Sequence, residues 1–472
     1  MIFHTIKRYV AAAALVAAGG GVPVFAQTRS LVPTLPSSSP FLGGVPESER
    51  SAQPLQLSIG DAIRRALEHN LGVLEAGERV AIARSARWAA LSELLPHIDG
   101  SVSESRRKTN LEAFGFPLRG EFPRVVGPFN VFDARLFVSQ ALVDLAAIND
   151  HRAEAHNVAA ARHDYRSARD TVVLVAANLY LQSLAAAARA DTARAQLETA
   201  QALLGQAQDL RQSGIVAGLD VVRAEVRLAA DRQRATAARN DYEKTKLQLA
   251  RVIGLPIGQE FTLSDDLPEV PVPELSLQDA LALAYRDRPD FLAAQERVSA
   301  AEAEVNAVRA DALPSVHVNA DYGAIGLTPR SALPTFSLTA AVTVPIFEGG
   351  RLQGRRLEAD ALLRQRRAEF DDLRAEIYYD VRTAFLDLQA TGEELQTATR
   401  ARELAAQQLE QSRDRFAAGV ANNIEVVQAQ EAVTLANEQY IAARYGFNVA
   451  KALLARSLGT AESAVEKYLG GK

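Results

Sequence analysis

The hydrophobic pattern of residues 335 to 356, TFSLTAAVTVPIFEGGRLQGRR, changes its period partway along. Up to Val344, apolar and small polar side chains alternate, which is typical of a strand with one apolar and one polar face. After a turn at Pro345, Gly349 and Gly350, a charged, alanine-rich run continues to the C-terminus without another proline. The pattern therefore predicts a two-faced strand that leads, through this turn, into one very long helix.

Four stretches show the pattern of such a strand. They are predicted at about 97–107, 129–140, 315–323 and 335–346. In 129–140 the apolar positions include Phe132, Leu136 and Val138, whereas Asp133 and Arg135 fall on the opposite face.

The chain contains two copies of one unit. LSIGDAI from Leu57 recurs as LSLQDAL from Leu275, an offset of 218 residues, whereas Gly214 and Gly254 match Gly419 and Gly459 at an offset of 205. We therefore expect repeat 1 over 55–262, a linker over 263–274, repeat 2 over 275–460 and a tail over 461–472. The change of 13 residues in the offset predicts a longer surface loop, over 108–128, in repeat 1.

Each repeat reads as a helix, two strands, a long helix and a return helix. The long helices are expected over 142–212 and 348–417, and the return helices over 219–253 and 420–458. A helix of roughly 70 residues is about 105 Å long, which exceeds the width of a globular domain. Because these helices are rich in alanine and have little apolar face, their partners must be other helices, within the chain and in other chains.

Composition indicates an exported protein. Residues 1–26 have the basic start, the apolar run and the small-residue end of a secretory signal peptide, and 27–54 read as an extended arm rich in Pro, Ser and Gly. The signal peptide removes two of the 52 basic residues and none of the 57 acidic ones, which leaves 50 against 57 and a net charge of −7. This charge argues against nucleic acid as a partner.

Two further absences from the sequence restrict its membrane role. The chain has no cysteine, so it has neither a disulfide nor a cysteine to carry a lipid anchor. Beyond the signal peptide no run of 18 apolar residues occurs, so a membrane role would have to use strands. Four strands cannot close a barrel, and an open edge in lipid leaves backbone groups unpaired. Several chains must pool their strands: two would give eight and three would give twelve.

The repeat order, VPIFEGGR and the two G…(D/E)V turns resemble the TolC-type outer-membrane efflux family over residues 55–460. The resemblance implies a membrane α+β fold, a homotrimeric 12-stranded outer-membrane β-barrel with four strands per chain. The barrel continues into a long antiparallel α-helical coiled-coil periplasmic tunnel. The resemblance implies neither a cofactor nor an enzymatic activity. It implies that the protein is the exit duct of a tripartite efflux or secretion system, with a periplasmic adaptor and an inner-membrane pump as partners.

The resemblance also assigns roles to residues at the far ends of the long helices. The adaptor-docking tips fall on two sets of three residues: Ser213, Gly214, Ile215 and Ala418, Gly419, Val420. The acidic periplasmic aperture falls on Asp220 and Glu425, and Gln428 stands where the family carries a second acid. Because the family's tip tyrosine and arginine fall on Phe416 and Ala421, we expect a weaker closure of the aperture.

Several alternatives remain open from the sequence. Asp220 and Glu425 are also expected in helix first turns, where an acid is stabilised by the helix dipole. Spacings of 5 and 7 between His151, His156 and His163 do not suit a helical metal site, so we expect a solvated face there. Small molecules such as drugs are the expected cargo. The rival functions are type I protein secretion, metal-ion efflux, and a periplasm-spanning structural coiled coil or adhesin.

Overall fold

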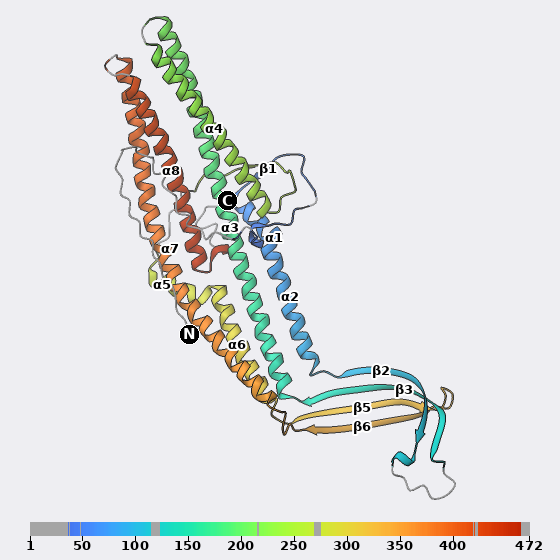
Figure 1. Cartoon of the computed structure of the whole chain (residues 1–472). Helices are drawn as coiled ribbons and strands as arrows, with labels where there is room; N and C mark the ends of the chain where they lie inside the picture. The colour runs from blue at the N-terminus through green and yellow to red at the C-terminus, as the bar shows by residue number, and fades with distance from the viewer. Residues whose placement is uncertain are drawn as a thin grey trace, which may run out of the picture.

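The protein is described by a computed structural model over residues 36, 38–47, 49–114, 123–214, 217–268, 275–418, 420 and 423–463, without the side chains of 416, 417 and 423. The predicted signal peptide lies outside these residues. The molecule is elongated, with the ends of two helical hairpins at one extreme and a four-stranded sheet at the other (Figure 1).

Two long helices form the length of the molecule. The helix α3 (Leu145–Gln212) has 68 residues and pairs with α2 (Leu71–Ser92) along one part and α4 (Gly218–Val252) along the other. The helix α7 (Arg351–Ala417), with 67 residues, pairs in the same way with α6 (Pro289–Ala310) and α8 (Asn423–Ser457). Each long helix is therefore about 100 Å long and is accompanied by two shorter ones.

Alanine explains how closely these helices pack. Ala193, Ala200 and Ala207 of α3 are buried and lie seven residues apart; α7 repeats the spacing with the buried residues Ala398, Ala405 and Ser412. A seven-residue repeat keeps one seam of a helix facing its partner, and small side chains on that seam let the two backbones approach. The two copies thus build the same antiparallel coiled coil.

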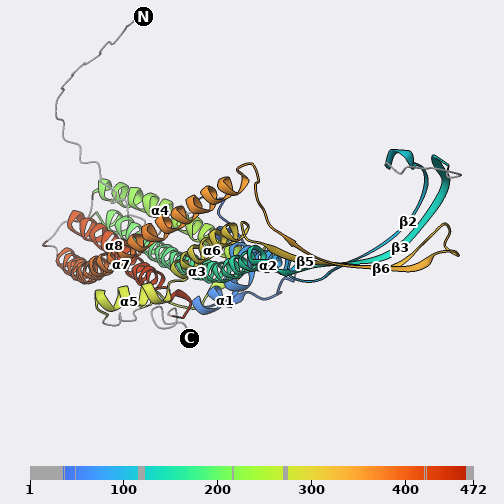
Figure 2. The same ribbon diagram turned by 90° about the horizontal axis from the view of Figure 1, so that it is seen from below.

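The sheet has the strand order β2-β3-β5-β6, with every neighbouring pair antiparallel. Its strands are β2 (His97–Asn110), β3 (Val125–Val143), β5 (Ser315–Gly326) and β6 (Leu333–Thr343). They run side by side away from the helices (Figure 2). The predicted loop over 108–128 is shorter than expected, because Thr109 and Asn110 still pair with Val126 and Val125; residues 115–122 lie outside the described part.

The register gives the sheet two chemically different faces. Val102, Ala134, Ala324 and Pro334 follow one another across the four strands, and one step along lie Gly100, Leu136, Tyr322 and Phe336. The opposite face carries Ser101, Arg135, Gly323 and Thr335. On that face Arg135 donates from Nη1 to Asp321 Oδ1 at 3.2 Å and pairs with Asp133 at 2.6 Å. One side of the sheet is thus apolar across these rows, with Glu104 and Arg106 toward its far end, and the other side is polar.

A small core lies midway along the helices. It joins α1 (Ile59–His69), the middle of α3, and two short parallel strands, β1 (Leu55–Leu57) and β4 (Phe261–Leu263). Tyr180 is fully buried there and donates to the Leu57 carbonyl at 2.8 Å. In repeat 2 a second core joins α5 (Leu277–Asp287), α7 and α8.

The expected arm and linker both contribute to the first core. Phe41, in a short 3-10 helix (Pro40–Leu42), packs against it, and its carbonyl accepts from Asn70 Nδ2 at 2.9 Å. The described part of the arm is therefore docked rather than freely extended, because its few apolar residues find a site on the helices. Leu267 of the expected linker is buried in the same core, whereas 269–274 lie outside the described residues.

One helix of the described residues, α3, has the length and apolar composition of a membrane span. Two thirds of its most apolar window, 67%, is buried inside the protomer. This apolar stretch is therefore accounted for by the core around Tyr180.

Candidate functional site

The turn between the sheet and the second long helix has the geometry that its sequence predicts. β6 ends at Thr343, and Pro345 lies in the irregular segment before α7 begins at Arg351. Gly349 and Gly350 have φ angles of 62° and 90°, which disfavour side chains, while a Cβ at either would meet nothing within 4 Å. These glycines therefore serve the backbone conformation and not close packing.

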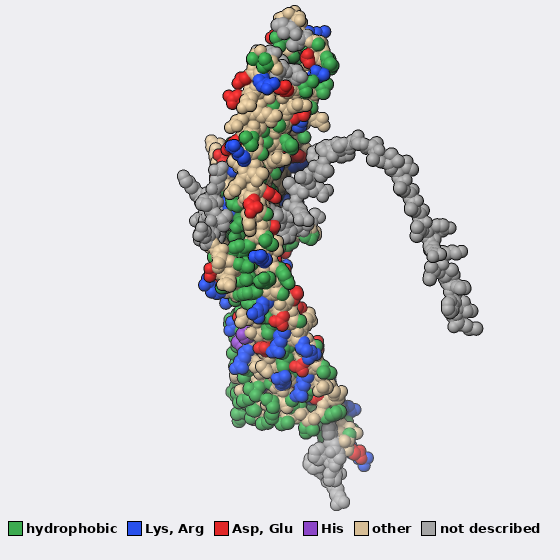
Figure 3. All heavy atoms as spheres, turned by 90° about the vertical axis from the view of Figure 1, so that its left-hand side faces the viewer, with side chains coloured by type: hydrophobic (Ala, Val, Ile, Leu, Met, Phe, Trp, Pro, Cys, Tyr) green, Lys and Arg blue, Asp and Glu red, His purple; other side chains and the backbone are tan. Residues whose placement is uncertain are grey.

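The same turn is strongly apolar on its surface. Ile346 and Phe347 are 95% and 87% exposed in the protomer. On the face drawn in Figure 3, hydrophobic side chains gather at the sheet end, while charges of both signs are spread along the helices. This end of the protomer therefore offers apolar surface to another chain or to lipid.

The matching turn in repeat 1 is built differently. There β3 ends at Val143, α3 begins at Leu145, and Asp144 between them accepts from the Ala147 backbone N–H at 2.9 Å. An aspartate cap thus stands where the second repeat uses proline and glycine. This cap was not predicted from the sequence.

The expected tips lie at the hairpin ends, which point away from the sheet (Figure 1). Ser213 caps the C-terminus of α3, and Gly214 follows with φ 72° and open space around the position of a Cβ. At the other tip Ala418 is exposed and Val420 is 68% exposed. Both described tips therefore present small or apolar surface to solvent.

Three expected tip residues, Ile215, Gly419 and Ala421, lie outside the described part of the chain, as does the Phe416 side chain. The roles expected for these residues therefore remain predictions.

Asp220 and Glu425 occupy equivalent places, each in the first turn of a return helix. Asp220 Oδ1 accepts from Arg223 at 3.2 Å, and Glu425 Oε2 lies 3.7 Å from Arg415 of the preceding helix. Gln428 is exposed one turn further along α8. Both acids thus stabilise the N-terminus of their helix, and both place a carboxylate near the hairpin ends, far from the sheet.

An ion-pair cluster that sequence reasoning missed joins the two hairpins. Asp231 of α4 is only 2% exposed and pairs with Arg227 at 2.9 Å and with Arg234. Arg227 also reaches Glu431 of α8 at 3.1 Å. Arg227 and Asp231, four residues apart and opposite in sign, are a signal for a helical pair, but Glu431 is more than 200 residues away in the chain. Only the tertiary structure brings it to the cluster.

The three histidines have separate surroundings. His151 Nε2 lies 3.4 Å from Arg87 Nε, and His156 Nδ1 lies 2.7 Å from Glu296 Oε2. Burial, with the charge of Arg166, holds the pKa of His163 below its ordinary value. Their arrangement is that of single side chains on a helix and not of one binding site.

A two-faced sheet of long strands that continues into about 100 Å of coiled coil defines a class of protein. It is the protomer of a membrane channel that crosses a bilayer with strands and extends from it with helices.

Residues 62–255 and 280–460 match the sequence profile of the outer membrane efflux protein family, and the chain belongs to that family. The pyoverdine export outer membrane protein OpmQ of Pseudomonas putida is 27% identical over 413 residues, which cover 84% of each chain. The alkaline protease secretion protein AprF of Pseudomonas aeruginosa is 23% identical over 416 residues, 86% of this chain and 85% of that protein.

A solved structure has the same fold. The outer membrane channel CmeC of Campylobacter jejuni superposes with a TM-score of 0.74 at 18% sequence identity, covering 91% of this chain and 93% of that one. The TolC-type fold of the chain is confirmed, as are its location in the outer membrane and its role as the outer-membrane channel of an efflux or secretion system.

Proposed function

We propose that three copies of the chain close a 12-stranded barrel and continue into one periplasmic tunnel. The tunnel is the exit duct of a tripartite system that carries small molecules, with no catalytic role of its own. A periplasmic adaptor docks at the tips around Gly214 and Gly419, and an inner-membrane pump supplies the cargo. The observation that carries this proposal is the four-stranded sheet, which has two edges without a strand partner and one mainly apolar face.

The edges demand partners. Among the described residues of the protomer, β2 pairs only with β3, and β6 only with β5, so each outer strand has a row of backbone groups without a strand partner there. The apolar face is open as well: Val102 is 75% exposed, Leu338 72% and Phe336 77%. In a bilayer the apolar face meets lipid, but the edge groups need hydrogen bonds, which the next copy supplies. Closure by three chains gives twelve strands, a size known for such barrels.

The far end of the tunnel supplies selectivity. Three chains bring six carboxylates, from Asp220 and Glu425, to the ends of the return helices. A ring of carboxylates favours cations in a narrow opening. Each of these acids has an arginine nearby on its own hairpin, Arg223 or Arg415, which reduces but does not abolish the negative field.

Small molecules are proposed as cargo because the relative with the higher identity is named for pyoverdine export. The relative named for alkaline protease secretion keeps a type I secretion duct as the second candidate.

A pair of single substitutions tests the assembly. Leu338→Arg puts a charge on the apolar face of β6, where it costs about 2–4 kcal/mol near the bilayer midplane. Thr339→Arg puts the same charge on the polar face, where water fills the lumen. We expect native mass spectrometry of outer-membrane extracts to find mostly trimer for the parent chain and Thr339→Arg, and at least roughly tenfold less for Leu338→Arg. Equal loss in both variants, or a monomeric parent, would contradict the proposal.

A further inference from the structure

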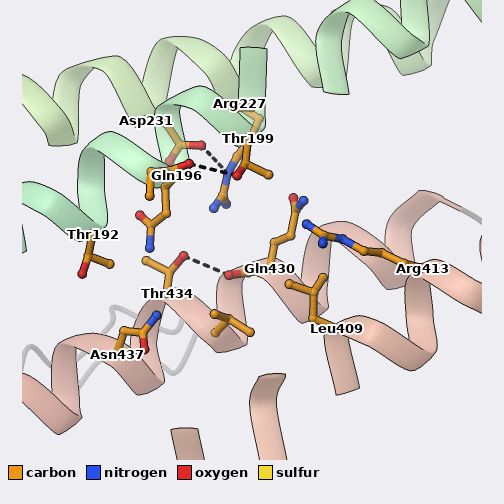
Figure 4. Close-up of a pocket in the computed structure, with 13 residues that line it drawn as sticks. Thr192, Gln196, Thr199, Arg227, Asp231, Leu409, Arg413, Gln430, Thr434 and Asn437 are labelled. Carbon is orange, nitrogen blue, oxygen red and sulfur yellow. Dashed lines mark hydrogen bonds and ion pairs between the residues drawn. The ribbon is translucent and has the colours of Figure 1, made fainter. Parts of the chain in front are cut away.

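A cavity of about 300 Å³ lies between the two hairpins, and all four of their helices line it. The lining residues include Thr199 of α3, Arg227 and Asp231 of α4, Arg413 of α7, and Gln430 and Thr434 of α8 (Figure 4). Its volume is at the lower end of the range for small-molecule sites. Gln430 lies about 10 Å from the start of α8, so the cavity is close to the proposed aperture.

The charges of the cavity wall leave an excess of positive charge. The carboxylate of Asp231 is already neutralised by Arg227 and Arg234. Arg227 is itself shared with Glu431. Arg413 lines the cavity as a second guanidinium and makes no ion pair or hydrogen bond to any other described residue. Arg413 is exposed, so this second cation of the cavity wall is solvated and is available to pair with a bound anion.

A buried hydrogen-bond donor points to the same place. Gln430 is only 9% exposed, and its Nε2 has no hydrogen-bond partner among the residues that the structure describes. Figure 4 shows the side chains of Gln430 and Arg413 pointing toward one another from α8 and α7. Because buried amide groups are normally paired, this one indicates a missing acceptor. An anionic oxygen would pair with both groups at once.

The rest of the wall is mixed. Leu409 and Val433 contribute aliphatic surface, and Ala195 and Ala200 contribute methyl groups. Thr199 and Thr434 each donate their hydroxyl proton to a carbonyl of their own helix, so they turn acceptor oxygens and methyl groups outward. Such a wall suits a compact molecule with one charged end and a short apolar body.

We propose that this cavity binds a small organic anion, whose carboxylate or sulfonate accepts from Arg413 and from Gln430 Nε2 and whose apolar part packs on Leu409 and Val433. These four residues all belong to the hairpin of α7 and α8. The remaining wall, with Thr199 and Arg227, belongs to the hairpin of α3 and α4, so an anion that fills the cavity also touches the first hairpin and, like the pair of Arg227 with Glu431, ties the two together. This second consequence rests on the proposed function and on one added premise, that the hairpins separate when the aperture opens. The binding site itself does not depend on it.

The absence of cysteine from the chain makes a chemical probe simple. Thr199→Cys places the only thiol in the cavity wall, and Gln201→Cys places it on the exposed face of the same helix. The full-length protein in nanodiscs is labelled with an anionic sulfonate methanethiosulfonate and with its cationic trimethylammonium analogue. We expect the ratio of anionic to cationic labelling rates to be roughly tenfold higher at the cavity thiol than at the exposed thiol. Adding Arg413→Gln should remove this preference.

Competition identifies the ligand class. Benzoate at millimolar concentration should slow labelling of the cavity thiol several-fold and leave the exposed thiol unchanged, whereas neutral benzamide should protect neither. No charge preference, or equal protection by benzamide, would overturn the binding site.

The proposed linking of the two hairpins by the bound anion is tested by a separate measurement, the open probability of the channel. In a conducting protein, benzoate should lower the open probability of the parent chain and not that of Arg413→Gln. Protection without this change would overturn the tie, whereas a protein that does not conduct would contradict the proposed function and leave the labelling result standing.

Discussion

The Arg288→Met variant is expected to lose about 3 kcal/mol of stability per chain, near the low end of what breaking a buried ion pair costs. Arg288 lies between α5 and α6, and its side chain is 7% exposed. It donates to Asp290 Oδ2 at 2.7 Å and to Asp380 Oδ2 of α7 at 2.9 Å. Methionine fills similar space but leaves both carboxylates without this partner. Because the two carboxylates are partly exposed, water recovers some of the loss.

The lowered pKa of Asp290 indicates that it is ionised beside Arg288. Burial disfavours the ionised form of Asp290, but the hydrogen bond and charge of Arg288 outweigh it and hold the pKa of Asp290 below its usual value. The stabilisation from Asp290 is therefore present above its unfolded-state pKa, about 4, and is lost as the pH falls through the lower folded-state pKa.

Arg286→Met is the matched control, because Arg286 is 70% exposed and pairs with its neighbour Asp287 at 2.8 Å. An exposed pair contributes only about 0–1 kcal/mol. Urea unfolding followed by helical circular dichroism should show a large shift of the midpoint for Arg288→Met and little for Arg286→Met. Similar midpoints for the two variants would contradict the account of the buried pair.

Gly459→Ala and Gly205→Ala, although chemically the same change, should shift stability in opposite directions. Gly459 follows α8 with φ 72°, and a Cβ there would lie 2.6 Å from Arg288 Cα and 2.8 Å from its backbone nitrogen. The left-handed backbone costs about 1–2 kcal/mol for an L side chain. Forcing backbone apart in a packed region adds about 1–3 kcal/mol. We therefore expect Gly459→Ala to destabilise each chain by about 3 kcal/mol.

Gly205 lies inside α3 with nothing within 4 Å of the position of a Cβ. Alanine in a helix interior is favoured over glycine by about 0.5–1 kcal/mol, so Gly205→Ala should raise the unfolding midpoint. The same urea experiment measures both variants. A destabilised Gly205→Ala, or a Gly459→Ala that unfolds like the parent, would show that the stated contacts do not control stability.

Most of the fold could be predicted from two features of the sequence, the internal repeat and the hydrophobic periodicity. Residues at the offset of 205 have the same structural role: Gly254 and Gly459 both adopt positive φ, and Ala193 and Ala398 are both buried. Alternation in a strand is a local pattern, so it can be recognised without knowing what the strand packs against. The seven-residue spacing of buried alanines is also local, but it was not among the predictions.

Features that depend on distant contacts could not be foreseen. The parallel pairing of Leu55–Leu57 with Phe261–Leu263 involves strands of three residues, too short to show a period. Gly127 and Pro128 near the start of β3, and the charged and polar residues at the end of β2, concealed the full length of the first hairpin. The pair of Arg227 with Glu431 forms only after the two hairpins have come together.

The carboxylate ring at the tips can be perturbed with a symmetric control. Asp220→Ala/Glu425→Ala removes two acids per chain from the first turns of the return helices. Asp209→Ala/Asp414→Ala removes the same charge from equivalent positions, 205 residues apart, in the last turn of each long helix. Only the first pair belongs to the proposed aperture.

The most direct test of the duct is single-channel conductance of the purified protein in a planar bilayer, beside these two double variants. A duct closed by the tips predicts a small, cation-preferring conductance. This conductance should grow or lose its selectivity in Asp220→Ala/Glu425→Ala and change little in Asp209→Ala/Asp414→Ala. If all three insert as trimers and none conducts, the tube is sealed. The structural coiled-coil function would then replace the duct, and the aperture would not lie at Asp220 and Glu425.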